Sequence, residues 1–134
     1  MARRNDSPPL PSDAQLEVLN ILWDLGEATV GEVWQVFSSR RPVARNTVLT
    51  LMARLEEKGW LCRRAEGNAL RYRATIPRQT ALRQLARRLV DTAFQGSTAG
   101  LVMSLLEEDL SAGEAERIRA MLDNARGKNK GRKD

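Results

Sequence analysis

Apolar residues in the first part of the chain recur at helical spacing in two adjacent segments. Ser12-Asp-Ala-Gln15 has the spacing of a capping box, and the apolar residues after it predict a helix that ends at Gly26. Thr29-Val-Gly-Glu32 is a second capping box. The apolar stripe that follows, at i, i+3, i+4 and i+7, predicts a short second helix that Pro42 breaks.

A third helix and a β-hairpin come next. Residues 48–55 repeat the helical spacing and predict a helix that ends at Lys58-Gly59. After Gly59 the period changes to two, which predicts strands at Trp60–Arg64 and Leu70–Ala74 joined by residues 65–69. The order helix, helix, helix, hairpin is that of a winged helix-turn-helix, in which the hairpin is the wing.

The alternation within the two strands assigns only one of them a buried face. On the second strand Leu70 and Tyr72 share one face, and Arg71 and Arg73 share the other. On the first strand the pattern leaves open whether Leu61 or the pair of Trp60 and Cys62 points inward.

Helical spacing returns from Arg78, and three more helices are predicted. Gly96-Ser97 separates the first two, and Ser111-Ala-Gly-Glu114 caps the last. Their apolar stripes are narrow, and helices owe most of their stability to tertiary packing, so a second copy of the chain is the simplest partner. The residues expected at this homodimer interface are Leu82, Leu85, Leu89, Phe94, Leu101, Leu105, Ile118 and Leu122.

The predicted fold is therefore mainly α with a small β-hairpin wing, a winged helix-turn-helix followed by a helical region. We expect a disordered arm over residues 1–11, a winged-helix domain over 12–77, a helical dimerisation region over 78–126 and a basic tail over 127–134. No stretch is apolar enough to span a membrane and the first residues lack the apolar core of a signal peptide, so a soluble cytoplasmic protein is expected.

Composition narrows the classes of function. The chain of 134 residues has no His and one Cys, so His-based catalysis, disulfides and Cys-cluster metal sites are excluded. No phosphate-cradling glycine loop and no paired nucleophile and base are visible, so we expect no cofactor, no metal and no enzyme. The acidic run Glu107-Glu108-Asp109 resembles a metal cluster only superficially, because adjacent helical positions point in different directions.

The charge distribution indicates a polyanionic partner. The formal net charge is +5, and the region 12–37 holds five acidic residues and no basic one. Residues 38–74 hold nine basic residues against three acidic ones, and these cluster at the start of the third helix and on the hairpin. A basic winged helix of this kind typically binds double-stranded DNA.

The outward face of the third helix carries side chains suited to base edges. Asn46 can pair bidentately with adenine, and Thr50 can bond either base type. Arg45 and Arg54 suit phosphates. On the hairpin the basic candidates are Arg63, Arg64, Arg71 and Arg73.

Each of these proposed DNA contacts also has a simpler structural interpretation. Asn46 and Thr47 could cap the third helix, since Ala44 is a poor N-cap, and the hairpin arginines could form only a solvated face. The three tryptophans, at apolar positions, are expected in the core rather than as stacking platforms. A whole-chain alternative is a winged-helix module for protein–protein interaction without specific DNA binding.

Three stretches carry a resemblance to a known family. They are LPSDAQLEVLNILWDLGEATVGEVWQVF, NTVLTLMARLEEKGWLCRRAEGNALRYRAT and AFQGSTAGLVMSLLEEDLSAGEAERIRAMLDNA, and residues 47–59 hold the pattern T-V-x-T-x-x-x-R-L-x-x-K-G. They resemble the penicillinase repressor (BlaI/MecI/CopY) family. The resemblance implies a homodimeric winged-helix repressor on inverted repeats, often of the TACA and TGTA kind. It places recognition residues at Asn46, Thr47, Thr50 and Arg54, and wing contacts near Arg63, Arg64 and Tyr72.

The chain also departs from that family. Asn46-Thr47 stands where members often carry two threonines, and Asn68 stands where a basic residue often follows the wing glycine. The paired cysteines that end the copper-responsive branch are absent from this sequence. The β-lactam branch is cut by a sensor protease at an Asn-Phe bond, and the aligned place here is Ser104-Leu105. The partner that releases the DNA, a sensor protease or a ligand, is not identified by the sequence.

Overall fold

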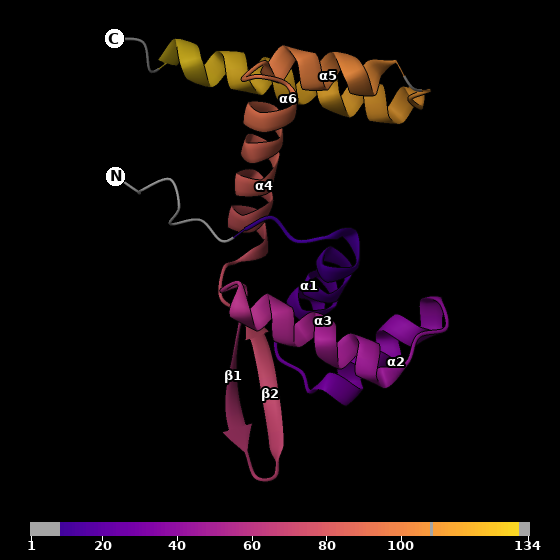
Figure 1. Cartoon of the computed structure of the whole chain (residues 1–134). Helices are drawn as coiled ribbons and strands as arrows, with labels where there is room; N and C mark the ends of the chain where they lie inside the picture. The colour runs from indigo at the N-terminus through magenta and orange to yellow at the C-terminus, as the bar shows by residue number, and fades with distance from the viewer. Residues whose placement is uncertain (1–8, 108, 132–134) are drawn as a thin grey trace. The chain divides into compact units, whose positions relative to one another are not determined.

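The computed structural model of the chain describes residues 9–107 and 109–131. The described residues form six helices and one two-stranded antiparallel sheet, and they divide into two compact units between Ala86 and Arg87 (Figure 1). The elements are α1 (Asp13–Leu25), α2 (Val30–Arg40), α3 (Arg45–Glu57), β1 (Leu61–Glu66), β2 (Ala69–Ala74), α4 (Arg78–Ala93), α5 (Thr98–Leu106) and α6 (Ala112–Gly131).

Both predicted capping boxes are present and start α1 and α2. The Ser12 hydroxyl accepts a hydrogen bond from the Gln15 backbone N–H at 3.2 Å, and Gln15 Oε1 accepts one from the Ser12 backbone N–H at 2.9 Å. Thr29 and Glu32 make the same exchange at 3.1 and 2.9 Å. Gly26 ends α1 with a φ of 86°, a left-handed conformation that side chains disfavour.

The first unit has one continuous core, to which α1, α2, α3, the hairpin and the start of α4 all contribute. The three tryptophans pack in or against this core, as the sequence predicts. Their indole N–H groups all donate to backbone carbonyls: Trp23 to Ile76 at 2.9 Å, Trp34 to Val43 at 2.9 Å and Trp60 to Pro9 at 2.8 Å. The core residues are Val18, Leu19, Ile21, Leu22, Ala28, Val33, Phe37, Val48, Met52, Leu55, Trp60, Leu61, Tyr72 and Ala81.

The hairpin is longer than predicted, because its strands continue to Glu66 and from Ala69. The predicted five-residue loop is wrong: only Gly67 and Asn68 form the turn, and Gly67 has a φ of 62° that allows so tight a connection. Leu61 is the inward residue of β1, on the face of Tyr72, while Trp60 is buried just before the strand begins.

A third backbone segment lies beside β2. The Ala28 N–H donates to the Tyr72 carbonyl at 3.0 Å, and the Tyr72 N–H donates to the Ala28 carbonyl at 2.8 Å. The wing is therefore hydrogen-bonded to the loop between α1 and α2, which the sequence pattern did not predict.

The structure corrects two predicted boundaries at the ends of the chain. The predicted disordered arm is wrong for residues 9–11, because Pro9 and Leu10 accept hydrogen bonds from Trp60 and from Lys58 Nζ; residues 1–8 lie outside the described residues. Residues 127–131 of the predicted basic tail continue α6, which ends at Gly131; residues 132–134 lie outside the described residues.

The division between the units lies inside α4 rather than at its start. Ala81 is fully buried and Leu85 packs against the core of the first unit, so the first turns of α4 belong to the winged-helix unit. Arg78 anchors this end of α4, since its guanidinium lies 2.8 Å from Asp24 and over the ring of Trp23.

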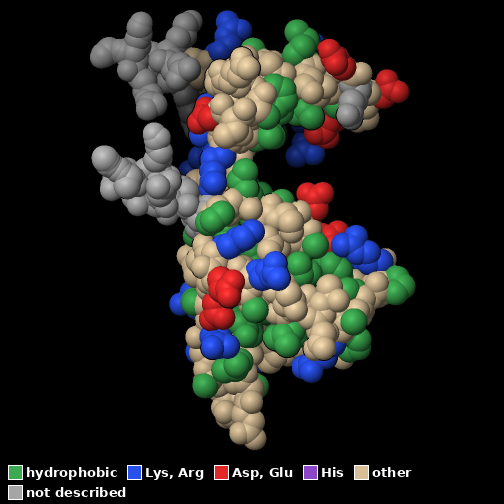
Figure 2. Space-filling view, viewed as in Figure 1, with side chains coloured by type: hydrophobic (Ala, Val, Ile, Leu, Met, Phe, Trp, Pro, Cys, Tyr) green, Lys and Arg blue, Asp and Glu red, His purple; other side chains and the backbone are tan. Residues whose placement is uncertain are grey.

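The second unit contains the rest of α4 with α5 and α6, and much of its apolar surface is exposed. The exposed large apolar side chains here include Leu89, Met103, Leu105, Leu106, Leu110, Met121 and Leu122. Apolar side chains also gather on the visible surface of α5 and α6 in Figure 2. Of the helices described, none has the length and apolar character needed to cross a membrane.

Candidate nucleic-acid interface

The outward face of α3 is accessible and polar, as the helical spacing predicts. Val48, Met52 and Leu55 face the core, and the opposite side of the helix is exposed. The exposed residues of that face are Arg45, Asn46, Thr47, Leu49, Thr50, Ala53, Arg54 and Glu57. In Figure 2 basic, acidic and apolar side chains are interspersed over the visible face of α3.

Asn46 and Thr47 do not cap α3. Ala44 occupies the N-cap position, and no side chain caps the helix there. Both residues lie in the first turn with exposed side chains, so the capping interpretation is wrong. The Trp34 indole instead holds the segment before α3 through its hydrogen bond to the Val43 carbonyl. Asn46 and Thr47 are left free of a capping role and available to a partner.

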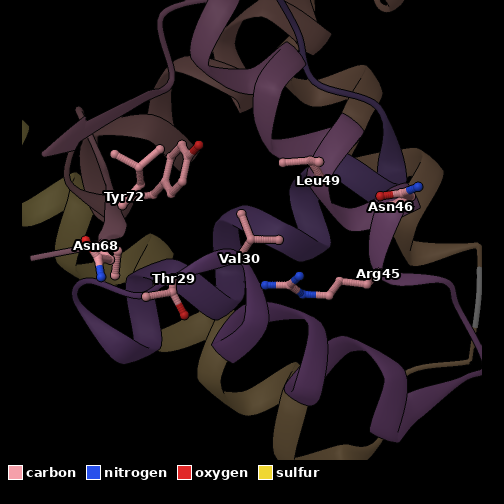
Figure 3. A pocket seen from close by; sticks show the side chains of 9 residues that line it. Thr29, Val30, Arg45, Asn46, Leu49, Asn68 and Tyr72 are labelled. Atoms are coloured by element: carbon pink, nitrogen blue, oxygen red, sulfur yellow. The ribbon is translucent and has the colours of Figure 1, made fainter. Parts of the chain in front are cut away.

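A pocket of about 460 Å³ lies between the start of α2, the start of α3 and the wing. Figure 3 shows Arg45 extending from α3 toward Val30 and Thr29, with Leu49 and Tyr72 also lining the space. A Cβ on Gly31 would lie 3.4 Å from Arg45 Nη2, so the guanidinium packs against the first turn of α2. Arg45 and the positive end of the α2 dipole make this pocket favourable for an anionic group such as phosphate.

A second, shallower hollow of about 600 Å³ follows the rest of α3. Its lining residues are Leu49, Thr50, Ala53, Arg54, Glu57 and Lys58. Thr50 and Arg54 are thus accessible from the side of the helix that faces away from the core.

The wing arginines divide into two pairs. Arg63 is half exposed, 3.3 Å from Glu56, and hydrogen bonding to Tyr72 followed by the charge of Glu56 raises its pKa. Arg73 is exposed and forms no ion pair with any other described residue. Arg64 and Arg71, by contrast, both bind Glu27, at 2.8 and 3.3 Å.

Glu27 is the residue of this surface that the sequence pattern missed. Hydrogen bonding from Arg64 is the main cause that lowers the pKa of its carboxyl below the ordinary 4.5, and Arg71 acts in the same direction, while burial opposes them. The same contact raises the pKa of Arg64. Glu27 is separated from both arginines by the whole of α2 and α3, so no local motif could have revealed the contacts.

Tyr72 differs from the other candidate residues because it is buried. Its side chain belongs to the core, and only 3% of the residue is exposed. A ring in this position stabilises the wing and presents little surface to a partner, so we leave Tyr72 out of the interface proposed below.

The residues expected to dimerise differ in exposure. Leu85 packs against the core of the first unit, whereas Leu82 and Leu89 are exposed on α4. In the second unit Leu105 and Leu122 are exposed, and Phe94, Leu101 and Ile118 are partly buried. Leu85 is thus occupied within its own chain.

The described residues contain no group of three or more His, Cys, Asp or Glu side chains that could hold a metal ion. Of the acidic run at 107–109, Glu108 lies outside the described residues.

Comparisons with known proteins agree with this geometry. The penicillinase repressor family matches residues 11–124. The methicillin resistance regulatory protein MecI of Mammaliicoccus sciuri is 26% identical over 113 residues, 84% of this chain and 92% of MecI. The penicillinase repressor of Bacillus licheniformis is 27% identical over 106 residues, 79% of this chain and 83% of that protein.

A solved structure shares the fold. Wild-type MarR from E. coli in its apo form is 21% identical, with a TM-score of 0.52 over 86% of this chain and 77% of MarR. That likeness shows a common winged-helix fold and nothing more specific. The family match, by contrast, spans both units and most of the chain. The chain belongs to the penicillinase repressor family.

Proposed function

We propose that this chain is a transcriptional repressor that binds DNA sequence-specifically, as a homodimer on inverted-repeat operators. The observation that carries the proposal is the exposed face of α3, where Asn46 and Thr50 lie between Arg45 and Arg54 on the outside of a packed winged-helix unit. Membership of a family of repressors supports the same function.

Each part of this surface suits one kind of DNA contact. With α3 in the major groove, the Asn46 amide can pair with adenine and the hydroxyls of Thr47 and Thr50 can bond base edges. Arg45 and Arg54 suit the flanking phosphates. On the wing, Arg63 and Arg73 are the arginines that Glu27 does not occupy.

The homodimer is proposed on the exposed apolar residues of α5 and α6. Large apolar patches on soluble chains commonly mark interaction surfaces, and Leu105 and Leu122 are each more than half exposed. A twofold pair would present two copies of α3 to half-sites about one helical turn of DNA, 10 to 10.5 base pairs, or a small multiple apart.

The proposal is tested by titrating labelled duplexes at several salt concentrations. One duplex carries the DNA upstream of the chain's own gene that the protein protects in footprinting, and the other carries the same bases in scrambled order. We expect the operator to bind about 10³-fold or more tightly than the scrambled duplex, and both affinities to fall as salt rises. Equal affinity for the two duplexes contradicts sequence-specific readout.

The same titration separates this function from the alternative. A winged-helix module that serves only protein–protein interaction predicts no measurable binding to either duplex, with or without the replacement of Arg63 and Arg73 by Ala.

A further inference from the structure

Two wing arginines face each other across the hairpin. Arg64 on β1 is paired in register with Arg71 on β2. Like charges directly opposite each other destabilise a strand pair. Glu27, from the loop between α1 and α2, contributes a negative charge at this position and contacts both guanidinium groups.

Glu27 uses all of its acceptor atoms on this pair. Its carboxylate accepts two hydrogen bonds from Arg64, from Nε and Nη2, each at 2.8 Å, in the forked geometry that makes arginine–carboxylate pairs strong. Arg71 Nε donates to the same carboxylate at 3.3 Å, and Arg71 Nη2 donates to the Glu27 backbone carbonyl at 3.1 Å.

The backbone on each side holds Glu27 in place. Gly26 turns the chain out of α1, and Ala28 is hydrogen-bonded to Tyr72 of β2 in both directions. Arg71 and Glu27 are only 24% and 26% exposed, so their contact is screened by salt less than a fully exposed pair would be. Together with the backbone pairing of Ala28 and Tyr72 and the longer contact of Arg71 with Glu32 at 3.7 Å, the Glu27 contacts link the wing to the body of the unit.

The Nε and Nη2 donors with which Arg64 holds the Glu27 carboxylate cannot bind a phosphate at the same time, because both anions use the same forked pair of donors. We propose that Glu27 is a positioning residue that occupies Arg64 and Arg71 in place of DNA phosphates. Glu27 thereby weakens the sequence-independent binding of the wing to DNA. The inference rests on the proposed function. It makes Glu27 a determinant of specificity that does not itself touch the DNA.

The test is Glu27→Gln in the full chain, because the amide keeps the size of the side chain and removes its charge. We expect affinity for the scrambled duplex to rise about threefold or more at low salt, and the slope of log affinity against log salt to steepen by about 1 to 2 per subunit, for one or two new phosphate contacts in each wing of the dimer. Operator affinity should rise less, so that the ratio of the two affinities falls.

Glu66→Gln is the matched control. Glu66 lies 3.7 and 3.3 Å from the same two arginines and carries the same charge, but it belongs to the wing itself and is 57% exposed. We expect it to change the scrambled-duplex affinity much less than Glu27→Gln does. Equal effects of the two variants would show that net charge alone is responsible, and would overturn the proposal.

A double variant traces the effect to the released side chain. Arg64→Ala should leave the salt slope unchanged in the wild-type chain and reduce it by about 1 per subunit in the Glu27→Gln chain, since only there is Arg64 available to a phosphate. An equal effect of Arg64→Ala in both chains contradicts the proposal.

A measurement on the wild-type protein without DNA tests the proposal even if one of the variants destabilises the wing. In the wild-type protein the Nε–H protons of Arg64 and Arg71 should exchange with solvent more slowly by NMR than that of Arg73. Equally fast exchange of all three overturns the proposal.

Failure of the proposed function and failure of the inference give different results. A wild-type chain that binds neither duplex contradicts the proposed function. A Glu27→Gln chain that binds DNA as a DNA-binding wild type does contradicts only the inference about Glu27.

Discussion

Asn46 is the side chain of α3 best suited to distinguish one base from another. Its amide is exposed in the first turn, and a bidentate pair with adenine contributes about 1–3 kcal/mol of discrimination. We expect Asn46→Ala to weaken operator binding by that amount at each half-site, about 5- to 150-fold per subunit, while affinity for scrambled DNA stays the same. Competition titrations with both duplexes measure the two effects together.

Arg54→Ala provides the comparison within the same helix. Arg54 is exposed on the same side of α3 as Asn46, closer to the end of the helix, where we propose a phosphate contact. Its loss should weaken operator and scrambled DNA about equally and reduce the salt slope by about 1 per subunit, about 2 for the dimer. If Asn46→Ala also weakened both duplexes equally, Asn46 would not read a base.

For single residues, the sequence predicts well which side chains are exposed and poorly which side chains contact one another. Helical spacing correctly places Asn46, Thr50 and Arg54 opposite the buried Val48 and Met52 of α3. The pairing of Arg64 and Arg71 with Glu27 depends on folding that brings distant residues together, so alternation within a strand could not distinguish these arginines from Arg73.

The start of α2 depends on its capping box. Thr29 accepts the Glu32 N–H, and Glu32 returns a hydrogen bond to the Thr29 N–H. Thr29→Ala should lower the free energy of unfolding by about 1 kcal/mol, since one N–H at the helix start loses its partner. Urea unfolding followed by circular dichroism measures this loss.

Ser12→Ala makes the equivalent change at α1, where the capping box has the same geometry. The two variants should lower stability by similar amounts. A Thr29→Ala chain as stable as the wild type would show that the α2 cap contributes nothing beyond the packing of Val33 and Phe37.

The attachment of the wing should depend on pH through Glu27. Its pKa is lowered in the folded protein, chiefly by the hydrogen bond from Arg64, so the contact stabilises the fold above the ordinary carboxyl pKa of 4.5. That contribution is lost as the pH falls through the lower, folded pKa. Wild-type stability should therefore fall more steeply than that of Glu27→Gln between about pH 5 and pH 3.

Thermal unfolding of both proteins across this range checks the prediction, and Glu66→Gln serves as the control for a change of charge on the exposed side of the wing. Parallel pH profiles of the wild type and Glu27→Gln would show that the carboxylate contributes nothing to stability through its ionised form.

Elements with strong local signals are the ones that the sequence predicts correctly. The capping boxes and Gly26 set the ends of α1 and the start of α2. The hairpin turn was predicted too long because Glu66 and Ala69 carry no strand signal of their own; they pair because Gly67 permits a two-residue turn. The segment at Ala28 that pairs with β2 is too short to have any periodicity.

At the scale of the whole molecule, α4 is shared between the two units. The sequence predicts a domain boundary between residues 77 and 78, where Pro77 ends the wing. The start of a helix need not coincide with the boundary between two packed units, and here the two differ. Ala81 and Leu85 pack with the winged-helix core, so only the later part of α4 belongs to the second unit. Leu85 is therefore unsuitable for a test of dimerisation, since a charge there would destabilise the first unit.

The proposed homodimer is better tested in α5 and α6, which contribute no described residue to the winged-helix core. Leu105 and Leu122 are 54% and 55% exposed. Replacing both by Glu should give monomers in sedimentation velocity, because two charges would be buried without partners at the interface. Operator affinity should fall by a large factor, since each monomer then contacts one half-site, and affinity for scrambled DNA should fall less, because only phosphate contacts are lost there.

Asn124→Glu is the matched control for this variant. It adds a negative charge at an exposed polar position of the same helix as Leu122, where no apolar contact is lost. This variant should remain a dimer and bind the operator as the wild type does. If the Leu105→Glu and Leu122→Glu chain also stayed dimeric, the interface would lie elsewhere, and Leu82 and Leu89 of α4 would be the next residues to replace, because they are the other exposed leucines of the predicted set.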